Sequence, residues 1–255
     1  MPLEIVTIPC LSDNYAYLAH DRASGDTALI DIPEAAPILD ALAQRGWKLS
    51  DVLITHHHDD HVQGLDAVLA AHPAGVIGAA PDAHRLPPLD VQVAEGDTVQ
   101  IGNETGHVID VSGHTVGHIA FHFPKSHVAF TADSLMALGC GRVFEGTHQQ
   151  MWHSLQKLAA LPPETLICSG HEYTAANARF ARTIDPGNPQ LTSRTDRIED
   201  ARDKGLPTVP SLLSLELETN PFLRAATPEV QQALNMAGAD PAQVFAEIRR
   251  RKDAF

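Results

Sequence analysis

Residues 55–61 constrain what this chain can fold into more than any other segment. Their sequence, THHHDDH, places four histidines and two aspartates in seven positions, directly after the apolar run VLI at residues 52–54. Neutral imidazoles and carboxylates are the ligands that zinc and iron prefer. Buried at a strand end, so many of them would otherwise need other polar partners. The segment therefore predicts a buried strand that ends in a metal site, with ligands for more than one ion.

The spacing within residues 55–61 predicts which side chains meet. In extended backbone, residues two apart point the same way, so His57 and Asp59 face away from the metal as spacers. His61 can join the converging side chains where the chain turns into a helix that begins near Gly64. The side chains expected to converge from the extended segment are His56, His58 and Asp60. This one loop therefore offers four ligands.

Four ligands cannot complete two coordination shells, and three further candidates stand where strand-like runs end: His114, Asp133 and His171. A glycine precedes each of the two histidines, and loops at one edge of a rigid sheet gather ligands easily. Any one of the three, taken alone, is equally well explained as a turn or capping residue. Their occurrence together, in order after residues 55–61, indicates a metal centre built from five histidines and two aspartates.

Two residues near these candidates have alternative interpretations. Asp31 ends a strand-like run and either orients a ligand histidine through a hydrogen bond or caps the turn before Pro33. Cys140 is chemically able to bind zinc, although a small buried cysteine between two glycines is the favoured interpretation. Other histidines are interpreted as packing or surface residues: His57, His107, His118, His122 and His127.

The pattern of apolar residues predicts an α+β fold. Hairpin-like strand pairs mixed with βα units indicate two sheets sandwiched between helices. Strands are expected at residues 4–9, 16–19, 28–32, 52–55, 76–79, 98–101, 107–111, 119–123, 128–131 and 165–169. Helices are expected between them at residues 35–44, 64–71 and 149–160.

From about Glu172 onward, helical patterns replace the strands. Prolines that follow Thr227 and Asp240 are conventional signals for the start of a helix. Helices are expected at residues 172–183, 189–204, 228–236 and 241–252, with an irregular, proline-rich connection at residues 205–223. We therefore expect a catalytic domain over residues 1–172 and a helical domain over residues 173–255.

The bulk composition excludes several classes of protein. Apolar residues make up 44% of the 255 positions and charged residues 20%, which indicates a globular core. No apolar run approaches the roughly 18 residues of a membrane span, and no signal peptide is expected. A net charge of −14 argues against nucleic acid or an anionic membrane as a partner. Three widely spaced cysteines fit a reducing cytoplasm without disulfides.

The pattern T-H-x-H-x-D-H, followed at later strand ends by a histidine, an aspartate and a histidine, resembles the metallo-β-lactamase superfamily. The resemblance implies the αβ/βα sandwich of that superfamily and two divalent metal ions. Zinc is the first expectation, with iron or manganese as alternatives, because histidine and aspartate suit all three. By the resemblance, Asp133 bridges the two ions and the other ligands divide into two sets: His56, His58 and His114 for one ion, and Asp60, His61 and His171 for the other.

Five further tracts resemble the glyoxalase II (hydroxyacylglutathione hydrolase) family from the first strand to the last helix. They are PCLSDNY (9–15), GCGRVFEGT (139–147), GHEYT (170–174), ETNPF (218–222) and RRRKD (249–253). The resemblance implies hydrolysis of S-D-lactoylglutathione to D-lactate and glutathione, the second step of methylglyoxal detoxification. A metal-bridging hydroxide would attack the thioester, with Asp60 and Asp133 as catalytic metal ligands. Because a thiol has a pKa near 8.5, the thiolate leaves without a dedicated general acid.

The same resemblance assigns the residues that bind glutathione. It places the glycine carboxylate end at Arg249 and Lys252, with Arg142 and Tyr173 completing the pocket. Positions 249 and 252 lie three apart and share one face of a helix. Compared with the animal members of the family, Arg142 replaces a lysine and Phe144 replaces a tyrosine. Arginine keeps the charge but changes the hydrogen-bond geometry, and phenylalanine removes a hydroxyl group.

We therefore expect a cytoplasmic monomer that binds a small-molecule glutathione thioester and engages neither nucleic acid nor membrane. Three other functions share parts of the pattern. A glutathione persulfide dioxygenase on the same scaffold uses one iron and should not need the full second ligand set. Another hydrolase of the superfamily would act on lactones, β-lactams or RNA, and a metal-binding protein without activity would hydrolyse no thioester. Metal content, oxygen uptake and thioesterase activity distinguish these functions.

Overall fold

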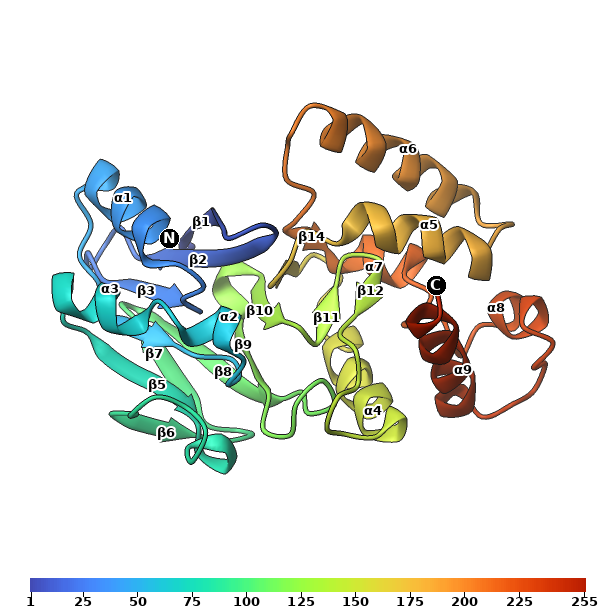
Figure 1. The fold of residues 1–255 in the computed structure, drawn as a ribbon, viewed down its shortest axis with the longest axis horizontal. Helices are drawn as coiled ribbons and strands as arrows, with labels where there is room; N and C mark the ends of the chain where they lie inside the picture. Colours follow the sequence, from blue (N-terminus) through green and yellow to red (C-terminus); the bar gives the residue numbers. More distant parts are fainter. The chain divides into compact units, whose positions relative to one another are not determined.

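The computed structural model describes residues 1–255, which divide into two compact units (Figure 1). The first unit consists of residues 1–110 and 117–132. The second consists of residues 111–116 and 133–255. The short loop 111–116 therefore belongs with the C-terminal part of the chain, although strands of the first unit flank it in the sequence.

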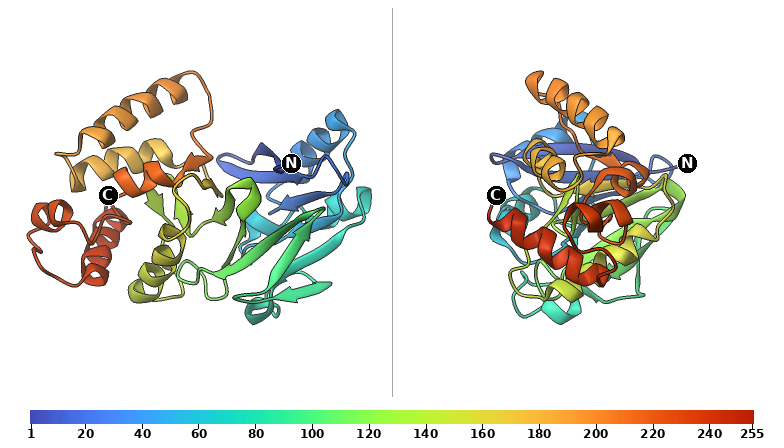
Figure 2. Two further views of the ribbon diagram at one scale, coloured as in Figure 1. Left: turned by 180° about the vertical axis from the view of Figure 1, so that it is seen from behind. Right: turned by 90° about the vertical axis from the view of Figure 1, so that its right-hand side faces the viewer.

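The larger sheet of the first unit has six strands in sequence order. Its first three strands pair antiparallel, and each later strand pairs parallel with the one before it. Helices α1 (Ala35–Arg45) and α3 (Leu65–Ala71) belong to the crossovers and lie side by side (Figures 1 and 2). The strands are β1 (Glu4–Cys10), β2 (Asn14–His20), β3 (Thr27–Ile30), β4 (Asp51–Leu53), β5 (Gly75–Ala79) and β6 (Val91–Val93).

The other strands of the first unit pair in the order β10-β9-β8-β7, and each neighbouring pair is antiparallel. Both β9 and β10 are buried along their whole length, which fits sequences that are apolar apart from His122 and Thr131. Tyr17 of β2 and Phe130 of β10 meet with ring centroids 5.7 Å apart, so the core lies between the two sets of strands. The strands are β7 (Thr98–Ile101), β8 (Glu104–Asp110), β9 (Ile119–Phe123) and β10 (Val128–Ala132). The predicted sandwich is therefore present.

The second unit is mainly helical. Helix α5 lies beside α6, and α4 packs against α9 (Figures 1 and 2). Side-chain caps start three of these helices: a capping box of Thr147 and Gln150 at α4, Asn188 at α6 and Asp240 at α9. The helices are α4 (His148–Ala159), α5 (Thr174–Ile184), α6 (Pro189–Asp203), α7 (Leu213–Thr219), α8 (Pro228–Ala233) and α9 (Pro241–Asp253).

Two short antiparallel pairs complete the second unit. Strands β11 (Leu135–Met136) and β12 (Gly139–Cys140) form a hairpin, and β13 (Leu166–Ser169) pairs with β14 (Ser211–Leu212). Neither β6 nor the β11–β12 hairpin was expected from the sequence. No helix in the structure is both long enough and apolar enough to cross a membrane.

The prediction of an irregular connection at residues 205–223 was wrong. The segment contains β14 and the helix α7. Prolines lie on both sides of this helix in the sequence. Residues 213–219 contain no proline and are long enough for about two helical turns. Tertiary contacts of buried Glu216, described below, hold the helix in place.

Candidate metal centre

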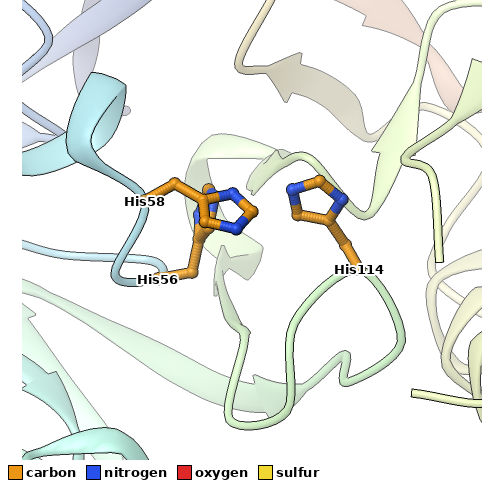
Figure 3. A group of neighbouring side chains, drawn as sticks. All are labelled: His56, His58 and His114. Carbon is orange, nitrogen blue, oxygen red and sulfur yellow. The ribbon is translucent and has the colours of Figure 1, made fainter. Parts of the chain in front are cut away.

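The loop after β4 carries the first group of candidate ligands. His56 is buried and His58 is partly buried, and Figure 3 shows their rings next to each other. His56 Nε2 lies 3.2 Å from His58 Nδ1. Two nitrogens that are each 2.0–2.1 Å from one tetrahedral zinc ion lie about 3.3 Å apart. The observed spacing therefore suits two ligands of one ion.

Asp60 and His61 form the other part of this group. Helix α2 (Asp59–Val62) begins directly after His58, so Asp60 lies in a helical turn. The expectation that Asp60 continues an extended segment was therefore wrong, whereas the helix expected to begin near Gly64 is present as α3, with Gly64 as its N-cap. The helical turn places Asp60 Oδ2 3.8 Å from Nε2 of buried His61. The two side chains are thus neighbours, as the ligand pattern requires, but through a different backbone.

The carboxylate of Asp31 orients His61. Its Oδ2 accepts hydrogen bonds from His61 Nδ1 and Thr55 Oγ1, both at 2.8 Å, and its Oδ1 accepts one from the Thr55 backbone N–H at 2.9 Å. A hydrogen bond donated by Nδ1 leaves Nε2 as the nitrogen that can bind a metal. Of the two roles considered for Asp31, these contacts support the orienting one. Its φ of +56° lies in the left-handed region, where a residue other than glycine is held by its surroundings.

Asn14 plays a comparable part for Asp60, and the sequence analysis missed it. The Asn14 side chain is buried and donates from Nδ2 to Asp60 Oδ2 at 2.9 Å and to the Asp60 backbone oxygen at 3.1 Å. The available signal was its place in the tract PCLSDNY, which carries the family resemblance but has no ligand pattern of its own.

Two of the histidines interpreted as packing or surface residues, His57 and His118, have contacts at this loop. His57 Nδ1 lies 2.9 Å from Oδ2 of buried Asp82, which also pairs with Arg85. The ring of buried His118 stacks on that of His56, with centroids 4.6 Å apart and an interplanar angle of 10°. These contacts support the ligand loop from outside the expected ligand set.

The second unit carries a separate cluster around Asp133. Its Oδ2 lies 3.2 Å from His171 Nε2 and 3.4 Å from His114 Nε2, and all three side chains are buried. These spacings are again close to the roughly 3.3 Å expected between two ligands of one tetrahedral ion. Asp133 directly follows β10, His171 follows β13, and His114, also drawn in Figure 3, lies in the loop 111–116.

Neighbouring groups fix two rings of this cluster. His114 Nδ1 lies 2.8 Å from the backbone oxygen of Arg142, to which it donates, so Nε2 faces Asp133. The ring of His171 stacks on Tyr173, with centroids 4.7 Å apart and an interplanar angle of 6°. Gly141 is required here, because a Cβ at this position would stand 2.0 Å from the Asp133 backbone oxygen and 2.9 Å from His114 Nδ1.

The donors in both units suit a metal ion. They are imidazole nitrogens and carboxylate oxygens, which bind zinc, iron and manganese alike. The structure therefore contains histidine and aspartate clusters able to bind metal. Burial raises the pKa of the Cys140 thiol to about 11, which fits the favoured interpretation of Cys140 as a small buried residue between two glycines.

Three of the four residues expected to bind substrate lie in one cationic group. Arg249 is buried, donates from Nη1 to the Cys140 backbone oxygen at 3.1 Å, and lies over the ring of Phe222. Lys252 Nζ lies 5.2 Å from the ring centroid of Phe180. Burial, with repulsion from Arg249 and Arg179, lowers the pKa of Lys252 from 10.5 to about 8.

Arg142 joins this group from the loop after β12. Its Nε lies 3.3 Å from Oδ1 of Asp253, the residue that follows Lys252, and its guanidinium lies over the exposed ring of Phe144. Tyr173 is exposed and lies against His171 instead. The second unit thus holds metal-type ligands and a group of cations on segments joined by the β11–β12 hairpin.

A buried polar network that the sequence did not reveal holds that hairpin. Asn220 donates from Nδ2 to the backbone oxygens of Met136 (3.1 Å) and Gly139 (2.9 Å). Glu216 accepts from the Leu138 backbone N–H at 2.8 Å and forms an ion pair with Arg194. The hairpin lies between Asp133 and Arg142, so this network supports a segment with a candidate ligand on one side and a candidate substrate contact on the other.

Comparison with known proteins defines the class of the chain. Residues 22–171 match the sequence model of the metallo-beta-lactamase superfamily. In the solved structure of BLEG-1 B3 metallo-beta-lactamase, 20% identical, the match covers 86% of this chain and 99% of that one with a TM-score of 0.67. The chain is therefore a member of the metallo-β-lactamase superfamily, and the predicted fold class is confirmed.

The C-terminal part narrows the class to one family. Residues 172–255 match the model described as the hydroxyacylglutathione hydrolase C-terminus. Proteins named hydroxyacylglutathione hydrolase from Ruegeria pomeroyi and Cereibacter sphaeroides are 66% and 63% identical over 255 residues, covering 100% of both chains. This chain belongs to the hydroxyacylglutathione hydrolase family. The resemblance found in the sequence is thereby confirmed.

A further solved structure extends the likeness at lower identity. A protein described as being in a di-iron-bound form is 25% identical with a TM-score of 0.61, and the match covers 86% of this chain and 100% of that one. A similar protein with this fold therefore holds two iron ions.

Proposed function

We propose that this chain hydrolyses S-D-lactoylglutathione to D-lactate and glutathione, the second step of methylglyoxal detoxification. The observation that carries the proposal is that the second unit joins the Asp133 cluster and the cationic group through one hairpin. A substrate that offers a hydrolysable bond at one end and a carboxylate at the other fits such an arrangement. The names of the full-length relatives point to the same substrate class.

Two divalent metal ions are the cofactors we propose, with zinc first and iron or manganese as alternatives. The donor chemistry supports them, as do the spacings of 3.2 Å between His56 and His58 and of 3.2–3.4 Å around Asp133. Asp31 and Asn14 would orient two of these ligands through the hydrogen bonds described above. The proposed ligands are His56, His58 and His114 for one ion, Asp60, His61 and His171 for the other, and Asp133 for both.

When bound, such ions lower the pKa of a coordinated water to about 7 and polarise the carbonyl group that is attacked. The chain's own contribution is to fix the ligands. Asp31 holds His61 in one tautomer, and the backbone oxygen of Arg142 does the same for His114. Asp60 and Asp133 act as catalytic residues in this scheme by holding the ions. The glutathione thiolate leaves without a proton donor, because its thiol has a pKa near 8.5.

Glutathione carries two carboxylates, and the cationic group supplies positive charge within an acidic chain. We assign the glycine carboxylate to Arg249 and Lys252, with Arg142 and Tyr173 completing the pocket. The pKa of Lys252 is lowered first by burial and then by neighbouring cations, and an incoming anion would offset the repulsion from those cations. Phe144 offers a ring surface where the animal members of the family have a hydroxyl group.

The division of labour that we propose follows the predicted domains, with catalysis in residues 1–172 and substrate binding in residues 173–255. We also propose a cytoplasmic monomer that binds neither nucleic acid nor membrane. The acidic net charge supports the absence of nucleic acid as a partner. Light scattering on a size-exclusion column tests the oligomeric state, since a monomer has a mass of 27.5 kDa.

One experiment tests the reaction and the cofactors together. Purified protein is assayed for hydrolysis of S-D-lactoylglutathione, and metals are quantified in the same sample. We expect turnover at about two metal ions per chain, its loss on chelation and its return on adding zinc, iron or manganese. A metal-loaded protein that turns over a lactone or β-lactam but not this thioester would contradict the proposal. Oxygen uptake with glutathione persulfide would instead indicate a dioxygenase.

A further inference from the structure

The carboxylate of Asp253 lies between two arginines from different segments. Asp253 is the last residue of α9. Its Oδ1 accepts from Arg249 Nε at 3.0 Å and from Arg249 Nη2 at 2.8 Å. The same oxygen lies 3.3 Å from Nε of Arg142, which comes from the loop after β12. One carboxylate oxygen thus holds both guanidinium groups.

The simplest explanation of the Arg249–Asp253 contact is an ion pair between residues four apart on one helix. Two observations point beyond it. Arg249 is only 5% exposed and also donates to the Cys140 backbone oxygen, so its guanidinium is fixed in position. Arg142 is not on the helix and is 56% exposed, so without a partner its long side chain would move freely in solvent. Asp253 is the group that holds Arg142 next to Arg249.

The charges around Asp253 make this contact informative. Arg142, Arg249 and Lys252 bring three positive charges to one place, and Asp253 brings one negative charge. Like charges gathered in this way repel each other, and an intervening carboxylate offsets the repulsion. The group keeps a net positive charge, which is what an anionic ligand requires. Arg249 also keeps an N–H donor for a ligand, because its four contacts do not use all five N–H bonds of a guanidinium.

We propose that Asp253 is a positioning residue for carboxylate recognition: it holds Arg142 and Arg249 in the arrangement that binds the glycine carboxylate of a glutathione thioester. This inference rests on the function proposed above. Asp253 touches the arginines and not the reacting atoms, so its removal weakens recognition of the carboxylate end and leaves the hydrolytic step intact. Preorganising two long side chains lowers the entropy that binding would otherwise cost.

The test compares two substrates that differ only at the carboxylate. S-D-lactoylglutathione is compared with its analogue in which the glycine carboxylate is a carboxamide, and the ratio of the two kcat/KM values is the readout. We expect the unchanged protein to prefer the carboxylate. In Asp253→Asn this preference should fall roughly two- to fivefold, the range for solvent-accessible ion pairs, mainly through a higher KM for the carboxylate substrate. A purely structural role would lower both kcat/KM values equally.

Three further variants serve as controls for this test. Asp253→Glu keeps the charge and should restore part of the preference. Glu247→Gln removes a carboxylate from the same helix that pairs with Arg250 and Arg251 instead, and it should leave the ratio unchanged. Asp253→Ser is a second neutral variant in case the asparagine variant does not fold, which circular dichroism establishes.

The outcomes separate the two proposals. An unchanged ratio in Asp253→Asn, with normal hydrolysis by the unchanged protein, overturns the role of Asp253 alone. A higher ratio also overturns it, because Asp253 would then compete with the substrate carboxylate. If the unchanged protein hydrolyses neither thioester, the proposed function itself fails.

Discussion

The two units hold their candidate metal ligands in different ways. In the first unit, four candidates come from one segment, residues 55–61. The loop after β4 and the four-residue helix α2 decide where their side chains point. In the second unit, three candidates come from three strand ends that lie far apart in the sequence. A local cluster depends mainly on its own loop. A cluster assembled from distant segments depends on every contact that holds those segments together.

The orienting groups differ in the same way. Side chains orient the ligands of the first unit, with Asp31 bound to His61 and Asn14 bound to Asp60. In the second unit a backbone oxygen orients His114, and its position is set by the loop that follows the β11–β12 hairpin. Mutation can therefore remove an orienting group directly in the first unit, whereas the backbone oxygen that orients His114 in the second can be displaced only indirectly.

The largest effect is expected from Asp133→Ala. Asp133 is the centre of the second cluster, so its loss should remove bound metal and lower kcat/KM by at least about a hundredfold. Metal analysis and steady-state kinetics on the same sample provide the measurement. Asp59→Ala is the matched control, because Asp59 is an exposed spacer in the ligand segment of the first unit. Full metal content in Asp133→Ala would show that the second cluster is not a metal site.

A smaller effect, roughly 10- to 100-fold in metal affinity, is expected from Asp31→Asn. The amide keeps one oxygen, which can still accept from the Thr55 backbone N–H, but its NH2 group replaces the charged Oδ2 that accepts from Thr55 Oγ1 and His61 Nδ1. Competition with a chromogenic chelator measures the affinity. Asp82→Asn changes another buried carboxylate bound to a histidine of the same loop, His57, which is not an expected ligand. Equal losses in the two variants would mean that loop packing, and not the orientation of His61, is what matters.

The same contrast explains what could be predicted from the sequence. The four candidate ligands of residues 55–61 could be predicted because they lie within one short segment of the sequence. The backbone of Asp60 was predicted incorrectly, because a helix of four residues leaves no periodic pattern from which its start could be read. His114, Asp133 and His171 were readable only as strand ends, and their meeting is a product of the tertiary fold.

The contacts that support the second cluster could not be predicted from the sequence. Asn220 contacts Met136 and Gly139 across 84 and 81 positions of sequence, and no local signal marks such a pair. The helix α7 was missed for a related reason. The prolines around it suggested an irregular segment, whereas buried contacts of Glu216 with Arg194 and with the Leu138 N–H stabilise the helix.

This non-local support predicts a stability effect for Asn220→Ala. The substitution leaves two buried backbone oxygens without their donor and should lower the free energy of unfolding by about 1–3 kcal/mol. Urea unfolding of the metal-free protein measures the change without a contribution from bound ions. Asn103→Ala is a control that removes an asparagine bound to Asp21 in the first unit, outside the hairpin. A metal-free stability equal to that of the unchanged protein would contradict the role of Asn220.

The smallest effect is expected from a substitution of Lys252. It distinguishes substrate binding from the positioning of candidate metal ligands in the second unit. Lys252→Ala should mainly raise KM, by roughly tenfold, with kcat little changed, because the proposed contact of this side chain is with the carboxylate end of the substrate and not with the thioester. Arg251→Ala is the control from the same helix, since Arg251 pairs with Glu247. A fall in kcat with unchanged KM would place Lys252 at the hydrolytic step.

The lowered pKa of Lys252 gives this prediction a pH dependence. With a pKa of about 8, the ammonium is charged below that pH and loses its proton as the pH rises through it. KM for the carboxylate substrate should therefore rise above about pH 8, and this rise should be absent in Lys252→Ala, after correction for spontaneous thioester hydrolysis. The effect on stability has the opposite sign. The unfolded chain keeps this proton up to about pH 10.5, so between the two values the unfolded state binds more protons and this group makes the folded state more stable as the pH rises.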